Sequence, residues 1–233
     1  MRIKVINPNG TASMTAKIHE AARAAAGAET GVVSVSPRAS PASIEGYYDE
    51  AVASMGILDE IAKGEKEGFD GFVIACFGDP GLLAARELAR APVVGIAEAA
   101  MRAASLISDG FTIVSMPSRA LTGMQRLVSS YGMDHLCRRI RMIDMPILRL
   151  EERGFDSRSV ILEECRKALL EDQSDCILLG CAGMADVADS ISLEIGAPAI
   201  DGVAVAVKMV EMLISLGLRT CKRMGYGCGA PHV

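Results

Sequence analysis

Two cysteines occupy places where an apolar segment runs into a Gly-rich turn, and their chemistry suits proton transfer at carbon. Cys76 lies in "VIACFGDPG" (73–81) and Cys181 lies in "ILLGCAGMAD" (177–186). A thiol has an unperturbed pKa of ~8.5, so its acid and base forms are both accessible near neutral pH. Two thiols on opposite sides of one carbon could remove a proton from one face and return one to the other. A racemase without a cofactor needs this arrangement.

The turn after Cys76 favours such a role over a passive one. A single cysteine at the end of a strand is usually a small buried hydrophobe. Here, however, Asp79 and Pro80 are typical of an N-cap and first helical residue, which predicts a helix start just after Cys76. Free amides and the helix dipole would then lower the thiol pKa. Gly78 and Gly183 would leave backbone amides open to a ligand oxygen.

Short apolar runs that alternate with amphipathic or Ala-rich segments must position these cysteines. The alternation predicts βαβ units and parallel sheets, and continuous apolar strands fit sheets covered on both faces. The expected strands are 3–6, 31–36, 71–75 and 93–96, then 111–116, 139–143, 175–180 and 197–201. The expected helices include 11–26, 44–66, 80–89, 118–131, 157–171 and 202–216.

The chain contains an internal repeat of about 105 residues. Asp70 precedes Cys76 by six residues, as Asp175 precedes Cys181, and "APVVG" and "APAIDG" follow in turn. The repeat predicts an α/β protein of two similar domains, each a parallel four-stranded sheet flanked by helices. We expect the first domain to comprise residues 1–98 and 208–233, and the second 99–207. Ligands bind beyond the carboxyl ends of parallel strands, so both cysteines should face one cleft between the domains.

Composition argues against several other classes of protein. The chain has 233 residues and a net charge of −5, so a nucleic acid is not an expected partner. The basic cluster "CRRIRM" (137–142) has helical spacing and suggests a solvated face or subunit contact. No apolar stretch approaches the ~20 residues of a membrane helix, and the N-terminal apolar part is short for a signal peptide. We therefore expect a cytoplasmic protein with reduced cysteines, no metal site and no membrane contact.

The sequence resembles a known family in several motifs. "MRIKVINPNGTASMT", "IEGYYDEA" (44–51), "IACFGDPGLLAARE", "LGCAGMAD" and "PAIDGVAVAVKMVE" (198–211) are similar to the hydantoin racemase branch of the Asp/Glu/hydantoin racemase superfamily, which includes allantoin racemases. The resemblance implies two α/β domains, an active site between them, and racemisation of 5-monosubstituted hydantoins at C5 by two cysteines. It further implies no cofactor or metal and a homo-oligomer.

The resemblance also implies which residues form the site. Cys76 and Cys181 match the two catalytic positions. The residues expected to bind substrate are Asn9, Phe77, Gly78, Asp79, Pro117, Ala182 and Gly183. Asn9 could instead only stabilise its own turn, and Asp79 has the more ordinary interpretation of a helix cap. Pro117, beside Met116, lies in a loop expected to shape the pocket for the 5-substituent.

Other activities compete with this interpretation. Aspartate and glutamate racemases usually carry Cys-Asn-Thr and Cys-Thr-His, whereas this chain has Cys-Phe-Gly and Cys-Ala-Gly, which favours a neutral ring held by backbone groups. The alternatives are an aspartate or glutamate racemase, a maleate isomerase, a lyase similar to arylmalonate decarboxylase, or a small-molecule binding protein without catalysis.

Overall fold

The computed structural model describes residues 1–152 and 154–227 and contains two parallel sheets with the same strand order. The first sheet is ordered β2-β1-β3-β4, with β1 at Arg2–Ile6, β2 at Gly31–Val35, β3 at Gly71–Ile74 and β4 at Val93–Gly95. The second is ordered β6-β5-β7-β8, with β5 at Phe111–Ser115, β6 at Cys137–Met142, β7 at Cys176–Leu179 and β8 at Ala199–Asp201. The predicted α/β fold is confirmed.

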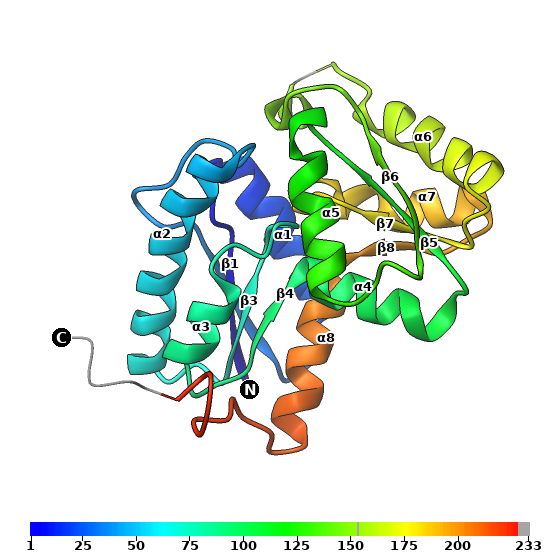
Figure 1. Cartoon of the computed structure of the whole chain (residues 1–233). Helices are drawn as coiled ribbons and strands as arrows, with labels where there is room; N and C mark the ends of the chain where they lie inside the picture. The colour runs from blue at the N-terminus through cyan, green and yellow to red at the C-terminus, as the bar shows by residue number, and fades with distance from the viewer. Residues whose placement is uncertain (153, 228–233) are drawn as a thin grey trace.

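Helices connect consecutive strands and flank both sheets (Figure 1). The α-helices are α1 (Ala12–Ala25), α2 (Tyr47–Lys66), α3 (Leu82–Leu88), α4 (Ile96–Ile107), α5 (Leu121–Ser130), α6 (Ser157–Glu171), α7 (Ala188–Ile195) and α8 (Gly202–Ser215). The described residues also form short 3-10 helices at η1 (Ser118–Ala120), η2 (Ile147–Glu151) and η3 (Ala182–Val187). No helix within the described ranges is long and apolar enough to cross a bilayer.

Helices α4 and α8 join the two halves of the molecule. They pack against each other, and α8 also packs against β3 and β4 of the first sheet although it follows β8 in the chain. Gly202 permits the close approach, because a methyl group there would lie 2.5 Å from the carbonyl oxygen of Ile96. Buried residues of both sheets and both helices therefore share one hydrophobic cluster. The domain division at residues 98 and 207 stays a prediction.

The sequence repeat has a counterpart in the contacts. Asp70 accepts a hydrogen bond from the backbone N–H of Arg2 at 2.7 Å, at the start of β1. Asp175 accepts one from the N–H of Asp109 at 2.8 Å, just before β5. Asp70 therefore joins the start of β3 to β1, and Asp175 joins the start of β7 to β5. Cys76 follows β3 and Cys181 follows β7, so the two cysteines follow equivalent strands.

The basic segment at 137–142 is an edge strand, which confirms the strand expected at 139–143 and shows that the helical spacing assigned to the basic cluster is wrong. Residues Cys137–Met142 form β6, which pairs with β5 alone. Arg141 on this strand is buried and forms ion pairs with Glu164 (2.9 Å), Glu171 (2.6 Å) and Asp172 (2.5 Å). Charged residues on an edge strand also discourage pairing with another chain.

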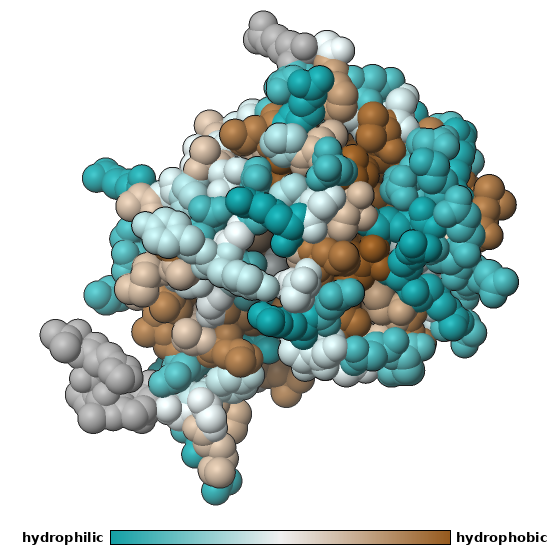
Figure 2. Space-filling model, turned by 45° about the horizontal axis from the view of Figure 1, so that its top comes forward, coloured by the Kyte–Doolittle hydropathy of each residue, from teal (hydrophilic) through white to brown (hydrophobic). Residues whose placement is uncertain are grey.

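Polar and apolar side chains share the surface. On the face turned forward in Figure 2, hydrophobic residues gather near the middle and are bordered by hydrophilic ones. Single exposed apolar side chains are normal in globular proteins.

Candidate active site

One cavity collects residues from the carboxyl ends of strands in both sheets. Its volume is ≈ 550 Å³. Asn9 follows β1, Cys76–Gly78 follow β3, Met116 follows β5, and Gly180–Gly183 follow β7. These are the central strands β1 and β3 of one sheet and β5 and β7 of the other. Parallel strands therefore deliver the sequence-predicted segments to one place, where ligands bind in open α/β sheets.

Cys76 and Cys181 both line this cavity and have matching surroundings. Each side chain is partly exposed and not in a disulfide. The backbone N–H of Gly78 acts to lower the pKa of Cys76, and that of Gly183 acts to lower the pKa of Cys181. The two thiols are close enough that a charge on Cys181 raises the pKa of Cys76. A donor two residues along the chain favours the thiolate at each site.

Both thiol pKa values lie above the ordinary range, which contradicts the expectation of lowered values. Burial raises the pKa of Cys76 to about 12 and that of Cys181 to about 11, outweighing the glycine donors. The expected helix start is also displaced, since α3 begins only at Leu82, after Gly81 in the left-handed region (φ 69°). Lys17 opposes the effect of burial by lowering the pKa of Cys181. Desolvation therefore dominates over the glycine donors at both thiols.

Asn9 stabilises its own turn and also lines the cavity. Its side-chain oxygen accepts hydrogen bonds from Asn7 Nδ2 (3.0 Å) and from the N–H of Thr11 (2.9 Å), which fixes its own turn. Its Nδ2 donates to the Met14 sulfur at 3.5 Å, and the residue lines the cavity. Because a thioether is a weak acceptor, the Asn9 amide retains donor capacity toward a ligand.

Asp79 does not line the cavity; its carboxylate is a cap, on a different helix from the one expected. The side chain is buried and accepts from the N–H groups of Ala97 (3.1 Å) and Glu98 (2.8 Å), in the first turn of α4. The Tyr131 hydroxyl, at the end of α5, donates to it at 2.6 Å. Burial raises the pKa of Asp79 to about 6. Asp79 therefore ties the turn after Cys76 to α4 and to the second half of the chain.

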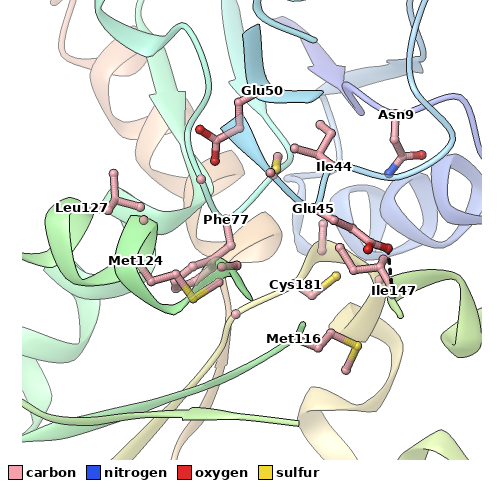
Figure 3. Close-up of a pocket in the computed structure, with 18 of the residues that line it drawn as sticks. Asn9, Ile44, Glu45, Glu50, Phe77, Met116, Met124, Leu127, Ile147 and Cys181 are labelled. Atoms are coloured by element: carbon pink, nitrogen blue, oxygen red, sulfur yellow. Dashed lines mark hydrogen bonds between the residues drawn. The ribbon is translucent and has the colours of Figure 1, made fainter. Parts of the chain in front are cut away.

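The remaining predicted residues divide between the cavity and its surroundings. Phe77, Gly78, Ala182 and Gly183 line it, whereas Pro117 is absent from the lining and its neighbour Met116 is present. Apolar side chains supply much of the rest of the wall, as Figure 3 shows for Ile44, Met116, Met124, Leu127 and Ile147.

A charged rim from residues 45–50 was not singled out from the sequence, although the motif "IEGYYDEA" contains it. Glu45 accepts a hydrogen bond from the N–H of Ile147 at 3.3 Å. Arg119 forms ion pairs with Glu45 (3.7 Å) and Asp49 (3.6 Å). These contacts join the start of α2 to η1 and η2 across the cavity. Glu50, in the first turn of α2, also lines the cavity.

Within residues 1–152 and 154–227, no group of three or more His, Cys, Asp and Glu side chains is arranged to hold a metal ion. Cys228 and His232 lie outside the described residues. The chemically active groups identified in the cavity are therefore thiols, carboxylates, guanidinium groups and backbone amides.

The comparisons with known proteins agree on a family. The profile described as Asp/Glu/Hydantoin racemase matches residues 3–210. A hydantoin racemase of Pseudomonas sp. (strain NS671) is 48% identical over 226 residues, which are 97% of this chain and 91% of that protein. The structure of an allantoin racemase from Klebsiella pneumoniae superposes with a TM-score of 0.98 at 48% identity, covering 99% of this chain and 94% of the other. Arylmalonate decarboxylase, at 17% identity and a TM-score of 0.66, with 98% of both chains covered, shares the fold.

Proposed function

The chain belongs to the Asp/Glu/Hydantoin racemase family, and we propose that it racemises 5-monosubstituted hydantoins, allantoin among them, at C5 through Cys76 and Cys181. The observation that carries the proposal is the pair of thiols in one cavity, each after the third strand of its own sheet in chain order. Relatives named hydantoin racemase and allantoin racemase support the substrate class.

The proposed reaction transfers one proton at each face of C5. One cysteine, as thiolate, takes the C5 proton, and the electron pair of the C–H bond is delocalised onto the adjacent ring carbonyl as an enolate. The other cysteine, as thiol, gives its proton to the opposite face of C5 and becomes the thiolate. The enzyme thus ends with its thiol and thiolate exchanged, ready for the reverse direction or for proton exchange with water.

The cavity walls support specific roles for the other residues. Phe77, Gly78, Ala182 and Gly183 provide main-chain contacts to the ring, and the Asn9 amide is placed to donate to a ring carbonyl. The Gly78 and Gly183 N–H groups stabilise whichever sulfur is the thiolate. The apolar wall, with Met116, receives the 5-substituent.

Substitution of each cysteine tests the proposal. Cys76→Ser and Cys181→Ser are each expected to abolish racemisation of a single enantiomer of 5-benzylhydantoin, followed by polarimetry. Cys221→Ser provides a matched control, because Cys221 is exposed and lies outside the cavity lining. Wild-type rates in both cavity variants would refute the two-cysteine mechanism. Loss in one variant only would indicate a single-cysteine isomerase or lyase.

We also propose that the reaction needs no cofactor and that the chain is a homo-oligomer. The enzyme should keep full activity after dialysis against a chelator followed by gel filtration. Light scattering should give a mass of two or more times the 24.5 kDa of one chain. Activity restored only by an added metal ion, or a monomeric mass, would contradict the corresponding proposal.

A further inference from the structure

Glu50 is a carboxylate in the cavity for which the two-cysteine mechanism has no use. It lies in the first turn of α2 and lines the cavity, with its carboxylate on the side of Leu127 and Phe77 (Figure 3). A methyl group added at Gly78 would lie 3.1 Å from Oε1 of Glu50. Its charge also raises the pKa of Cys76. Glu50 therefore stands beside the segment that carries one of the two thiols.

The neighbouring acidic residues have partners, and Glu50 does not. Glu45 accepts from Ser43 Oγ at 3.0 Å and from a backbone amide of η2, and Asp49 accepts from the N–H of Glu45 at 3.1 Å. Arg119 pairs with both of them. In the part of the chain that the structure describes, the Glu50 carboxylate has neither a hydrogen-bond nor an ion-pair partner. The Glu50 carboxylate is thus left free to accept a hydrogen bond from a ligand in the cavity.

We propose that Glu50 determines substrate specificity by accepting a hydrogen bond from an N–H of the hydantoin ring. This inference rests on the function proposed above. A hydantoin presents N–H and C=O groups alternately along its edge, and a carboxylate can only accept, so it pairs with an N–H. Burial and the charge of Asp49 raise the pKa of Glu50, which makes it a stronger acceptor than an exposed carboxylate.

Roles in proton transfer fit Glu50 less well. An ionised carboxylate that faced the enolate oxygen would repel the charge that develops there, so it must meet a donor on another part of the ring. A site built to bond a ring N–H also rejects analogues that lack it, since a bound analogue would cover the carboxylate and leave it unpaired. This would select cyclic amides over N-alkylated or ester rings of the same shape.

The test compares Glu50→Ala and Glu50→Gln with wild type on three substrates: 5-benzylhydantoin and its N1-methyl and N3-methyl analogues. The benzyl group carries no N–H, so only the ring can donate. Wild type should use one of the two methylated analogues at least tenfold less efficiently than the parent. Glu50→Ala should lose about 10- to 100-fold in kcat/KM on the parent, the range for a charge-assisted hydrogen bond, and should no longer discriminate against that analogue.

Two variants control for other effects. Glu50→Gln keeps the size and a neutral acceptor, so it should lie between wild type and Glu50→Ala and guards against misfolding of the alanine variant. Asp59→Asn removes a negative charge from the exposed side of the same helix and should leave all three rates unchanged.

The outcomes separate this inference from the proposed function. If wild type racemises 5-benzylhydantoin but Glu50→Ala discriminates among the three substrates as wild type does, the inference is overturned and the proposed function stands. If Glu50→Ala instead racemises faster than wild type at pH 7 and its pH profile shifts to lower pH, the inference is also overturned. Glu50 would then act only through its charge, by raising the pKa of Cys76. If wild type racemises none of the hydantoins, the proposed function fails and the inference with it.

Discussion

Replacing Tyr131 by phenylalanine tests the hydrogen bonds to Asp79 that hold the turn after Cys76 in place. The Tyr131 hydroxyl donates at 2.6 Å to the buried Asp79 carboxylate, which also accepts from two N–H groups of α4. Tyr131→Phe deletes one charge-assisted hydrogen bond and leaves the other two. Such a bond contributes about 1.5–3 kcal/mol, so we expect the free energy of unfolding to fall by this amount at pH 8.

The loss should depend on pH in a direction set by Asp79. Burial raises the folded-state pKa of this carboxyl from its ordinary value of 3.8 to about 6. Asp79 therefore favours folding at low pH, and its contribution is lost as pH rises through 6. The Tyr131 hydrogen bond acts the opposite way, because it lowers the Asp79 pKa and stabilises the ionised form. The Tyr131→Phe deficit should therefore be full above pH 7 and shrink below pH 6, toward the ~1 kcal/mol of a neutral hydrogen bond.

Urea unfolding followed by circular dichroism at pH 8 and pH 5 measures both quantities. Tyr47→Phe serves as a control, since the Tyr47 hydroxyl accepts only a long bond of 3.4 Å from Arg126 and the side chain is exposed. A Tyr131→Phe loss that is equal at the two pH values, or below about 0.5 kcal/mol at pH 8, would refute the reasoning about Asp79.

Three further predictions concern the cavity. Burial raises the pKa of Cys76 to about 12 and that of Cys181 to about 11, so few molecules at neutral pH have one thiol and one thiolate. We therefore expect kcat/KM to rise about tenfold per pH unit from pH 7 to pH 9. A kcat/KM that does not change with pH over this range would contradict the prediction. Gly180→Ala should destabilise the protein by about 1–3 kcal/mol in chemical unfolding, since the new methyl would lie 2.5 Å from the Ser115 Cβ; an unchanged midpoint would count against it. Arg119→Ala should change the unfolding free energy by less than about 1 kcal/mol, because the ion pairs of Arg119 are long and this side chain is exposed. The same variant should raise KM in steady-state assays. A large loss of stability with an unchanged KM would contradict this prediction.

Much of the fold could be predicted because the strands are continuous apolar runs. The residues of β3, β5 and β7 are all buried, as their sequences suggest. The repeat then predicted two like sheets with a cysteine after an equivalent strand in each. The strand expected at 139–143 is present as β6, but the helical spacing assigned to the basic cluster at 137–142 is wrong, because an edge strand can carry charged side chains on its open side. Arg141 on that strand is buried by carboxylates distant in sequence, which no local pattern reveals.

The sequence could predict which residues reach the site, because their position follows from the local order of strands and turns. It could not predict the pKa values of these residues, because those depend on burial in the folded protein. Cys76 and Cys181 reach one cavity because the ends of parallel strands meet there. Their raised pKa values arise from desolvation by the assembled fold, which outweighs the local helix-start effect expected from the sequence. Asp79 is a cap, as its residue type suggested, but of a helix about twenty residues further on. Glu50 reaches the cavity only because α2 starts at its rim.

Racemisation of one enantiomer in heavy water tests the central claim most directly, with the deuterium content at C5 read by mass spectrometry or NMR during the first turnovers. If separate thiols serve the two faces, the newly formed enantiomer carries deuterium from the start while the remaining substrate keeps its protium. A newly formed enantiomer that retains the original protium would mean that one group carries the same proton across, and the assignment of Cys76 and Cys181 as opposing acid and base would be wrong.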